Sequence, residues 1–381
     1  MGIIKKVIAF IILLGVFIYL INSFTLKPSL KTNSLDFVKL PEGFKIEVFA
    51  DSLGGSKIST PGPNPGPRIM AVKDNIVFVS VPSEGKVIAL EDKNKYSKIE
   101  DQKIFMQNLN NPHGISLFDD WVYIAEEDKV IRVKDTDKDN IADTETMEEL
   151  IDLPSGSHWT RTIKIIDKYL FVSIGSTCNV CDEKDNRRAS IQRCNLDGKN
   201  CIAFASGLRN SVDFIRAQNG KIYATENGRD GLGNNIPPDE INIIEEGKDY
   251  GWPNCYGKQI LDTEFDKNIY IRNPCLDTEP SFIDLPAHVA PLGLEVYTGV
   301  KFPEEYRGKL FVAYHGSWNS ETPVGYKIVY IDLNTKEIKD FVSGFLTDLT
   351  VKGRLVGIIN YNNELLVSDD NAGKIYRIYY E

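Results

Sequence analysis

Six basic or imidazole side chains each stand directly before a short apolar segment, and each opens one copy of an imperfect repeat. They are Arg68, His113, His158, Arg209, His288 and Arg354. A single arginine or histidine at the start of a strand commonly pairs with a carboxylate or caps carbonyl groups, so the argument rests on the position that all six share. If the repeats form a ring, the six side chains meet at one mouth. In a chain of net charge −10, such a mouth suits a small anionic ligand.

The repeats predict an all-β fold. Their clearest marker is a β-branched and aromatic segment that recurs as Ile76–Ser80, Val122–Ala125, Leu170–Ser173, Ile222–Thr225, Leu310–Ala313 and Leu365–Ser368. Four strand-like segments per repeat indicate a six-bladed β-propeller of four-stranded antiparallel blades. The last repeat has only three such segments before Tyr380, and Phe44–Ala50 can supply the fourth. We therefore expect an N-terminal strand to close the ring and cover a sheet edge.

The blade topology also predicts which loops share a face. In an antiparallel blade, the loop leading into the first strand and the loop joining the second and third strands lie at the same end. All four histidines, His113, His158, His288 and His315, fall in such loops, and so does Trp318. We expect this face to be the binding mouth, where the indole of Trp318 could cover a flat ligand or simply pack in the core.

The N-terminus is expected to lie outside the propeller. Lys5 and Lys6 precede the apolar run Val7–Ile21, which is near the ~20 residues that a membrane-spanning helix needs. The pattern favours a membrane anchor over residues 1–24, with a cleaved signal peptide as the alternative. Residues 25–40 would be a tether and 41–381 an extracytoplasmic propeller, secreted if the anchor is cleaved. The acidic composition, without clusters of lysine and arginine, excludes nucleic acid as a partner.

All six cysteines follow residue 177, and export predicts that they form disulfides. A two-residue hairpin turn at Asp197-Gly198 would place Cys194 opposite Cys201, within disulfide range. Cys255 and Cys275 would close a loop between repeats. Cys178 and Cys181 form a C-x-x-C motif, which is a redox or zinc motif in cytosolic proteins. Because no second pair at zinc spacing accompanies it, a structural disulfide is the preferred interpretation.

One acidic loop has carboxylates at alternating positions, as in EF-hand-type loops. These are Asp135, Asp137, Asp139 and Asp143. Asn140 replaces the usual turn glycine and Thr146 replaces the closing glutamate. The loop is interpreted either as a structural Ca²⁺ site of modest affinity or as a solvated acidic hairpin.

Nine segments also carry a family resemblance over about residues 40–381. They are Leu40–Ile46, His158–Thr162, Gly175–Cys181, Gly207–Asn210, Glu226–Gly233, Pro237–Asn242, Asp249–Pro253, Pro286–Leu294 and His315–Asn319. Together these segments resemble the glucose/sorbosone dehydrogenase family, in particular its sorbosone-dehydrogenase-like members. Those proteins are six-bladed propellers that oxidise sugars with pyrroloquinoline quinone (PQQ) and Ca²⁺.

The resemblance implies roles for residues of this chain. His158 matches the family's base, and Arg209 would polarise the quinone oxygen as charge develops there. Residues implied to contact PQQ are Arg68, His113, Arg161, Arg209, Asn210, Asn227, Arg229, His315, Trp318 and Arg354. Residues implied to hold the active-site Ca²⁺ are Gly228, Arg229, Asp230, Asp239 and Glu240. One departure is Ser176, which stands where broader family members place an aspartate that orients the histidine, so the orienting partner is left open.

These observations predict a PQQ-dependent dehydrogenase that oxidises an aldose, pyranose or related aldehyde by hydride transfer to the quinone. Its electrons would pass to an extracytoplasmic acceptor, either a cytochrome or a quinone. One alternative is a non-redox propeller that binds glycans or a protein partner. A weaker alternative is a calcium-dependent lactonase-type hydrolase, which would need Ca²⁺ deep in the central channel.

Overall fold

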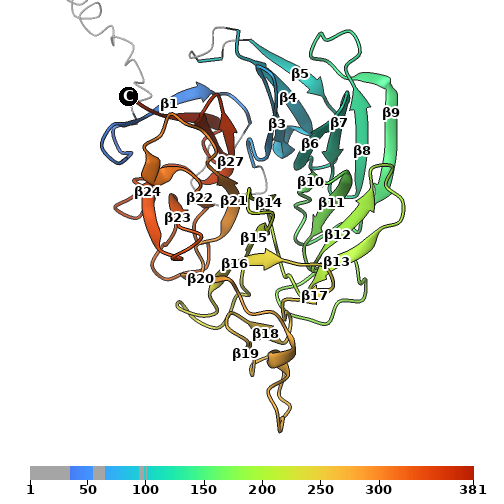
Figure 1. Cartoon of the computed structure of the whole chain (residues 1–381), viewed down its shortest axis with the longest axis vertical. Helices are drawn as coiled ribbons and strands as arrows, with labels where there is room; N and C mark the ends of the chain where they lie inside the picture. The colour runs from blue at the N-terminus through green and yellow to red at the C-terminus, as the bar shows by residue number, and fades with distance from the viewer. Residues whose placement is uncertain (1–34, 55–64, 94–97, 100) are drawn as a thin grey trace, which may run out of the picture. The chain divides into compact units, whose positions relative to one another are not determined.

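The computed structural model describes residues 35–54, 65–93, 98–99 and 101–381 (Figure 1). The expected membrane anchor and most of the expected tether lie outside these residues. Within the described part of the chain, no helix is long and apolar enough to cross a membrane.

The first three blades follow one another along the chain, each built from strands that are neighbours in sequence. Blade 1 contains β2 (Met70–Lys73), β3 (Ile76–Val81), β4 (Lys86–Glu91) and β5 (Gln102–Met106). Blade 2 contains β6 (Gly114–Phe118), β7 (Trp121–Ala125), β8 (Lys129–Lys134) and β9 (Asp143–Asp152). Blade 3 contains β10 (Ile163–Ile166), β11 (Tyr169–Ile174), β12 (Ser190–Asn195) and β13 (Ile202–Ser206), with β17 (Lys248–Asp249) added in parallel at its edge.

The other three blades complete the ring, which confirms the predicted six-bladed propeller (Figure 1). Blade 4 contains β14 (Phe214–Arg216), β15 (Ile222–Glu226), β16 (Asp239–Ile244) and β20 (Ile283–Leu285). Blade 5 contains β21 (Pro291–Val296), β22 (Leu310–Tyr314), β23 (Lys327–Ile331) and β24 (Ile338–Val342). Blade 6 contains β27 (Leu355–Tyr361), β28 (Glu364–Asp369), β29 (Lys374–Tyr380) and, as its outer strand, β1 (Phe44–Ala50).

Short elements decorate the loops between these strands. Two small antiparallel pairs are β18 (Cys255–Tyr256) with β19 (Ile260–Leu261), and β25 (Leu346–Thr347) with β26 (Thr350–Val351). Three 3₁₀ turns are η1 (Pro82–Glu84), η2 (Pro274–Asp277) and η3 (Glu304–Tyr306).

The N-terminal strand closes the ring as predicted. In β1, Phe44 pairs with Tyr380 of β29, and the antiparallel pairing reaches Ala50 opposite Ile375 after a register shift between Val48 and Ala50. The Phe44 ring makes edge contacts with four aromatic rings, at 4.8–5.0 Å between ring centroids. These are the rings of Phe302, Tyr306, Phe341 and Tyr380. Burial of aromatic surface and the ladder hydrogen bonds therefore fasten the first strand to the last blade.

The folded unit also includes part of the expected tether. Lys39 forms an isolated antiparallel bridge with Ser343, with backbone hydrogen bonds of 2.9 and 3.0 Å. The Phe37 ring lies 5.5 Å from the Phe345 ring in an edge contact. The compact unit thus begins at Phe37.

The recurring marker strand contributes to the joints between blades. In four blades the marker segment ends in a serine or threonine, one residue before the end of the strand, whose hydroxyl donates to a carbonyl of the next blade. Ser80 Oγ donates to the carbonyl of His113 at 2.7 Å, and Ser368 Oγ donates to that of Arg68 at 2.6 Å. Thr225 Oγ1 donates to the Leu292 carbonyl at 2.9 Å, and Ser173 Oγ to the Ser211 carbonyl. These bonds fix the backbone that carries the repeat-opening residues, which is how the fold positions the mouth.

Three disulfides are present, including the predicted Cys194–Cys201. The prediction of the turn next to it was wrong. Gly198 N donates to Asn195 O at 2.9 Å and Asn195 N donates to Lys199 O at 2.8 Å, so the turn spans three residues. Gly198 has φ 77°, a left-handed conformation that makes it a bulge. A compensating irregularity at Asn200 (φ 54°) restores the register, so the two cysteines still face each other.

Candidate active site

A pocket of about 220 Å³ opens between the loops of blades 3, 4 and 5. Its walls come from loops that lead into a blade's first strand and from loops that join the second and third strands. The lining residues are His158, Arg209, Asn210, Asn227, Gly228, Asp230, Asp239, His288, Ala290, Trp318 and Asn319. The structure therefore brings together His158, Arg209 and seven further residues named from the sequence, namely Asn210, Asn227, Gly228, Asp230, Asp239, His288 and Trp318.

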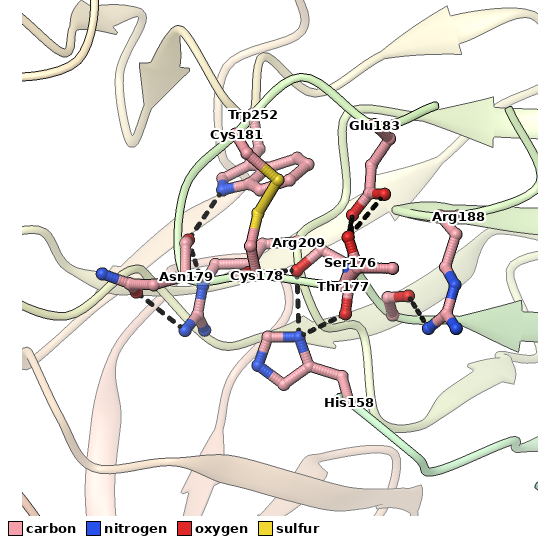
Figure 2. The surroundings of a disulfide bond; sticks show 11 residues. His158, Ser176, Thr177, Cys178, Asn179, Cys181, Glu183, Arg188, Arg209 and Trp252 are labelled. Carbon is pink, nitrogen blue, oxygen red and sulfur yellow. Dashed lines mark hydrogen bonds between the residues drawn. A yellow bond between two sulfur atoms is a disulfide. The ribbon is translucent and has the colours of Figure 1, made fainter. Parts of the chain in front are cut away.

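The ring of His158 is oriented by Ser176. Its Nδ1 lies 3.0 Å from the Ser176 carbonyl oxygen and 2.9 Å from Ser176 Oγ (Figure 2). A carbonyl oxygen can only accept, and Ser176 Oγ already donates to the Cys178 carbonyl at 2.7 Å. Nδ1 must therefore carry the proton, which leaves the lone pair on Nε2. Ser176 thus fills the orienting role that the sequence left open.

The surroundings of His158 keep its imidazole neutral. Burial and, after it, the positive charges of Arg209, Arg161 and Arg188 lower the pKa of His158 to about 3. A hydrogen bond to Ser176 opposes this shift without reversing it. At neutral pH the group is an unprotonated base, as proton abstraction requires.

The guanidinium of Arg209 is buried and held on three sides. Its Nε donates to Asn179 O at 2.9 Å, its Nη1 to Asn227 O at 3.1 Å and its Nη2 to Asn179 Oδ1 at 3.0 Å. Asp230 Oδ2 lies 3.3 Å from Nη2. The Asp230 side chain is 27% exposed against 7% for Arg209, so its negative charge is partly screened by water. The pocket wall consequently keeps a fixed cation.

The carboxylates named as calcium ligands divide between two places. Asp239 lines the pocket, and its two oxygens accept from the backbone N–H of Gly228 and of Ala290, both at 2.8 Å. Burial raises the pKa of Asp239 to about 7. Glu240 instead accepts from Gly257 N at 2.6 Å and faces a neighbouring cavity.

Arg229 belongs to that neighbouring cavity too. Its Nε lies 3.1 Å from Asp262 Oδ2, and both side chains are nearly buried. In the described residues around the main pocket, no three carboxylates bring their oxygens within 4.8 Å of one another. A cation at this pocket would therefore need backbone carbonyl oxygens besides Asp230 and Asp239.

A second group of predicted residues gathers around Asp370 instead of lining the pocket. Arg68 Nη1 lies 2.6 Å from Asp370 Oδ2, and His315 Nε2 lies 3.0 Å from Asp370 Oδ1. Arg354 Nη1 is 3.3 Å from His315 Nδ1, and this guanidinium also donates to the carbonyls of Gly316 and Ser317 at 3.0 and 3.1 Å. Asp370 thus pairs with Arg68, whereas Arg354 is held by uncharged acceptors.

His113 and Arg161 are fully buried, and both contact the loop that leads into β10. Arg161 donates to the carbonyls of His158 and Pro154, both at 2.6 Å, and so fixes the loop before β10. His113 Nδ1 is 3.3 Å from Thr162 Oγ1, and its ring contacts the Trp159 ring edge-on at 5.6 Å.

The acidic loop between β8 and β9 brings three of its four carboxylates together. Oxygens of Asp135, Asp137 and Asp139 lie within 4.8 Å of one another. Asp143 instead accepts from Thr136 N at 2.6 Å. Hydrogen bonds from backbone N–H groups of the loop also reach Asp135 and Asp139.

Sequence reasoning predicted no role for three residues that hold the predicted groups in place. Asn179 contacts Arg209 and Asp230, Asn319 donates to Asp230, and Asp370 gathers the second cluster. Asn179 lies inside the C-x-x-C motif, for which a structural disulfide was the preferred interpretation and no role for Asn179 was predicted. Asp370 lies in a loop that joins a second and a third strand, and several such loops carry acidic residues. Its place on the mouth face could therefore be predicted from the sequence, but its partners could not.

Comparison with known proteins agrees with this architecture. The TrAA12-like family model matches residues 66–380. The chain belongs to the TrAA12-like family. An uncharacterised protein of Borreliella burgdorferi is 38% identical to this TrAA12-like chain, with 96% of each covered. A PQQ-dependent pyranose dehydrogenase of Coprinopsis cinerea is 28% identical over 221 residues, which are 46% of this chain and 30% of that protein.

Solved structures share the fold of the TrAA12-like chain. The calcium structure of a Trichoderma reesei enzyme of family AA12 has a TM-score of 0.74 at 18% identity, covering 90% of this chain and 97% of the other. The holo form of the PQQ domain of pyranose dehydrogenase from Coprinopsis cinerea has a TM-score of 0.73 with the same identity and coverage. The predicted kinship with PQQ-dependent sugar dehydrogenases is confirmed. Family and fold support a function of that general kind.

Proposed function

We propose that this protein is a PQQ-dependent dehydrogenase that oxidises an aldose, a pyranose or a related aldehyde in the pocket between blades 3, 4 and 5. The observation that carries the proposal is the pairing of a neutral, oriented imidazole with a fixed guanidinium in one pocket. His158 presents its basic Nε2 because Ser176 holds the proton on Nδ1. Arg209 lines the same pocket.

The pocket's donor set suits a flat polyanionic quinone. Arg209 supplies a buried positive charge, and a planar guanidinium pairs well with carboxylate or quinone oxygens. Trp318 is 69% exposed at the rim and offers an aromatic face to a planar ligand or a sugar ring. When bound, PQQ supplies the electrophilic carbon that accepts the hydride.

The residues expected to hold Ca²⁺ are fewer than the sequence suggested. Asp230 and Asp239 line the pocket beside the Gly228 backbone and offer hard oxygens of the kind Ca²⁺ prefers. Glu240 and Arg229 face the neighbouring cavity and are left out of this proposal. The positive charge of a bound cation would keep Asp239 ionised against the effect of burial.

Each protein group then has a defined task. His158 Nε2 takes the proton from the sugar hydroxyl as the C–H bond at the same carbon releases its hydride. Arg209 would stabilise negative charge on an oxygen of a bound quinone. Trp318 and Asn319 would border the sugar. The two electrons would pass to an extracytoplasmic acceptor, either a cytochrome or a quinone. Three disulfides agree with an oxidising compartment.

Reconstitution tests the proposal. Purified apo-protein is mixed with PQQ and Ca²⁺, and reduction of an artificial dye is followed with a panel of aldoses and pyranoses. Dye reduction that requires both additions is the expected result. Absence of PQQ binding would overturn it in favour of a binding propeller, and hydrolysis of lactones with Ca²⁺ alone would overturn it in favour of a hydrolase.

A further inference from the structure

The loop between β11 and β12 contacts both groups proposed for catalysis, and it contains the Cys178–Cys181 disulfide. Figure 2 shows His158 hydrogen-bonded to Ser176, two residues before Cys178, and Arg209 hydrogen-bonded to Asn179, between the bridged cysteines. Ser176 orients the imidazole, and the Ser176 hydroxyl donates a hydrogen bond to the carbonyl oxygen of Cys178. The orientation of His158 is thus tied directly to a disulfide-bonded residue.

Asn179, between the two cysteines, makes the second connection. Its carbonyl accepts from Arg209 Nε at 2.9 Å and from Trp252 Nε1 at 3.3 Å. Its side-chain Oδ1 accepts from Arg209 Nη2 at 3.0 Å and from Asp230 N at 2.7 Å, while Nδ2 donates to Asp230 O at 2.9 Å. One exposed residue therefore links the guanidinium to the loop that carries Asp230, and the bridge on either side of it restricts its backbone.

We infer that the Cys178–Cys181 disulfide is a redox-sensitive clamp, which positions His158 through Ser176 and positions Arg209 and Asp230 through Asn179. This inference rests on the proposed function of the pocket. Ser176 and Asn179 are positioning residues, because they act through His158, Arg209 and Asp230. The C-x-x-C motif then does more than stabilise the fold.

The exposure of the sulfur-bearing residues favours reduction of this bridge over Cys255–Cys275, whereas Cys201 of the Cys194–Cys201 bridge is also exposed. Cys178 and Cys181 are both half-buried on the mouth face, whereas Cys255 is 5% exposed and Cys275 is fully buried. Thiol–disulfide exchange requires in-line approach of a thiolate to a sulfur atom. A small dithiol should therefore reach Cys178–Cys181 before Cys255–Cys275.

The chemistry is a two-electron exchange. One thiolate of the dithiol attacks a sulfur of the bridge and displaces the other cysteine as a thiolate, which takes up a proton. The second thiol of the reductant then closes its own disulfide and releases the first cysteine. The protein gains two thiols and the reductant loses two. The loop keeps its contact between Thr177 and Glu183, so we expect it to loosen without unfolding.

The first experiment reads the clamp without turnover. Apo-protein labelled with ¹⁵N in its four histidines is titrated with dithiothreitol, and the nitrogen shifts report the tautomer of His158. A chelator is present because the reduced Cys178 and Cys181 could bind metal together with Glu183. We expect the Nδ1–H form to dominate before reduction, to lose its dominance after it, and to return on reoxidation. An unchanged tautomer with fully reduced Cys178 and Cys181 would overturn the inference.

Variants separate the clamp from general stabilisation. We expect Cys178→Ser/Cys181→Ser to lower kcat and to weaken PQQ binding at least about tenfold, as loss of a hydrogen bond to a charged group would. The matched control, Cys194→Ser/Cys201→Ser, removes a bridge in the same blade and should leave both values unchanged. Asn179→Ala keeps the disulfide but should reproduce the weaker PQQ binding. Equal losses in both double variants, or full PQQ affinity in Asn179→Ala, would contradict the clamp.

These outcomes can be told apart from failure of the proposed function. If the unmodified protein binds no PQQ, the proposed function is overturned. If it binds PQQ and turns over sugar, but reduction of Cys178–Cys181 changes neither PQQ affinity nor the His158 tautomer, only the clamp is overturned.

Discussion

Two halves of the mouth are built from equivalent repeat positions but differ in what their charges do. In blades 3 and 4, His158 and Arg209 line a pocket, and Arg209 has one partly exposed carboxylate partner, Asp230. On the opposite half, Arg68 and His315 share the buried carboxylate of Asp370. The repeat determines where each side chain stands, and the local counter-ion determines whether its charge is available to a ligand.

The electrostatics of the second half explain why the charge of Arg68 is not available to a ligand. Burial raises the pKa of Asp370, but the interactions with His315 and Arg68 together hold that pKa below its ordinary value. Burial also lowers the pKa of His315 despite the nearby carboxylate. The stable state is an ionised Asp370 paired with Arg68 beside a neutral imidazole. Breaking such a buried pair costs much more than an exposed pair is worth.

The largest expected effect comes from His158→Ala. Removal of the base should lower kcat on the order of 10⁴-fold, the upper range for general base catalysis, while PQQ affinity changes little. Stopped-flow reduction of the quinone and fluorescence titration with PQQ measure the two quantities. If the variant loses PQQ binding as well as turnover, His158 belongs to the cofactor site and not to proton transfer.

Arg209→Gln should come next, with kcat lower by about 10³-fold because a preorganised donor to developing charge is lost. The matched substitution in the other half, Arg68→Gln, should change kcat less than about threefold. Steady-state kinetics of both variants at saturating PQQ and Ca²⁺ make the comparison. Similar losses of kcat in the two variants would mean that the halves do not differ in function.

Asp370→Asn should affect stability and leave catalysis nearly unchanged. It leaves Arg68 buried without its carboxylate partner, which should lower the free energy of unfolding by about 3 kcal/mol. Urea unfolding followed by tryptophan fluorescence measures this change. A loss below about 1 kcal/mol would show that Arg68 gains another partner or water.

The pH dependence of His158 sharpens the same contrast. Its pKa of about 3 lies below the ordinary value of about 6.5, so in the apo-protein its ring should remain neutral until the pH falls towards 3. Between these two pH values, His158 binds more protons in the unfolded chain than in the folded protein. The contribution of His158 to the free energy of unfolding therefore rises with pH. NMR titration of the ring Cε1–H tests this, and a midpoint near 6.5 would place His158 in open solvent.

The smallest effect is expected from Trp318→Ala at the rim. Because the indole is largely exposed, its loss should raise KM for the sugar by about threefold and leave kcat unchanged. Initial rates over a range of sugar concentrations separate the two. A fall in kcat would show that Trp318 orders the reacting groups.

The sequence by itself determined the scaffold and the face that carries the site. Strand periodicity and the recurring marker segments predicted the blades, and the missing strand of the last repeat predicted β1. The Cys194–Cys201 bridge was predicted as well, although its turn was not. These features depend on local alternation and on short spacings, so they can be recognised in one dimension.

Only the tertiary structure decided which equivalent residues meet a ligand. Arg68 and Asp370 are 302 positions apart in sequence, yet Arg68 Nη1 lies 2.6 Å from Asp370 Oδ2. Arg209 likewise donates to Asn179, which is 30 positions away in sequence. The neighbours Asp239 and Glu240 face different cavities because successive strand residues point to opposite sides. Counter-ions and hydrogen-bond partners come from whichever loops the ring brings together, and no repeat spacing encodes them.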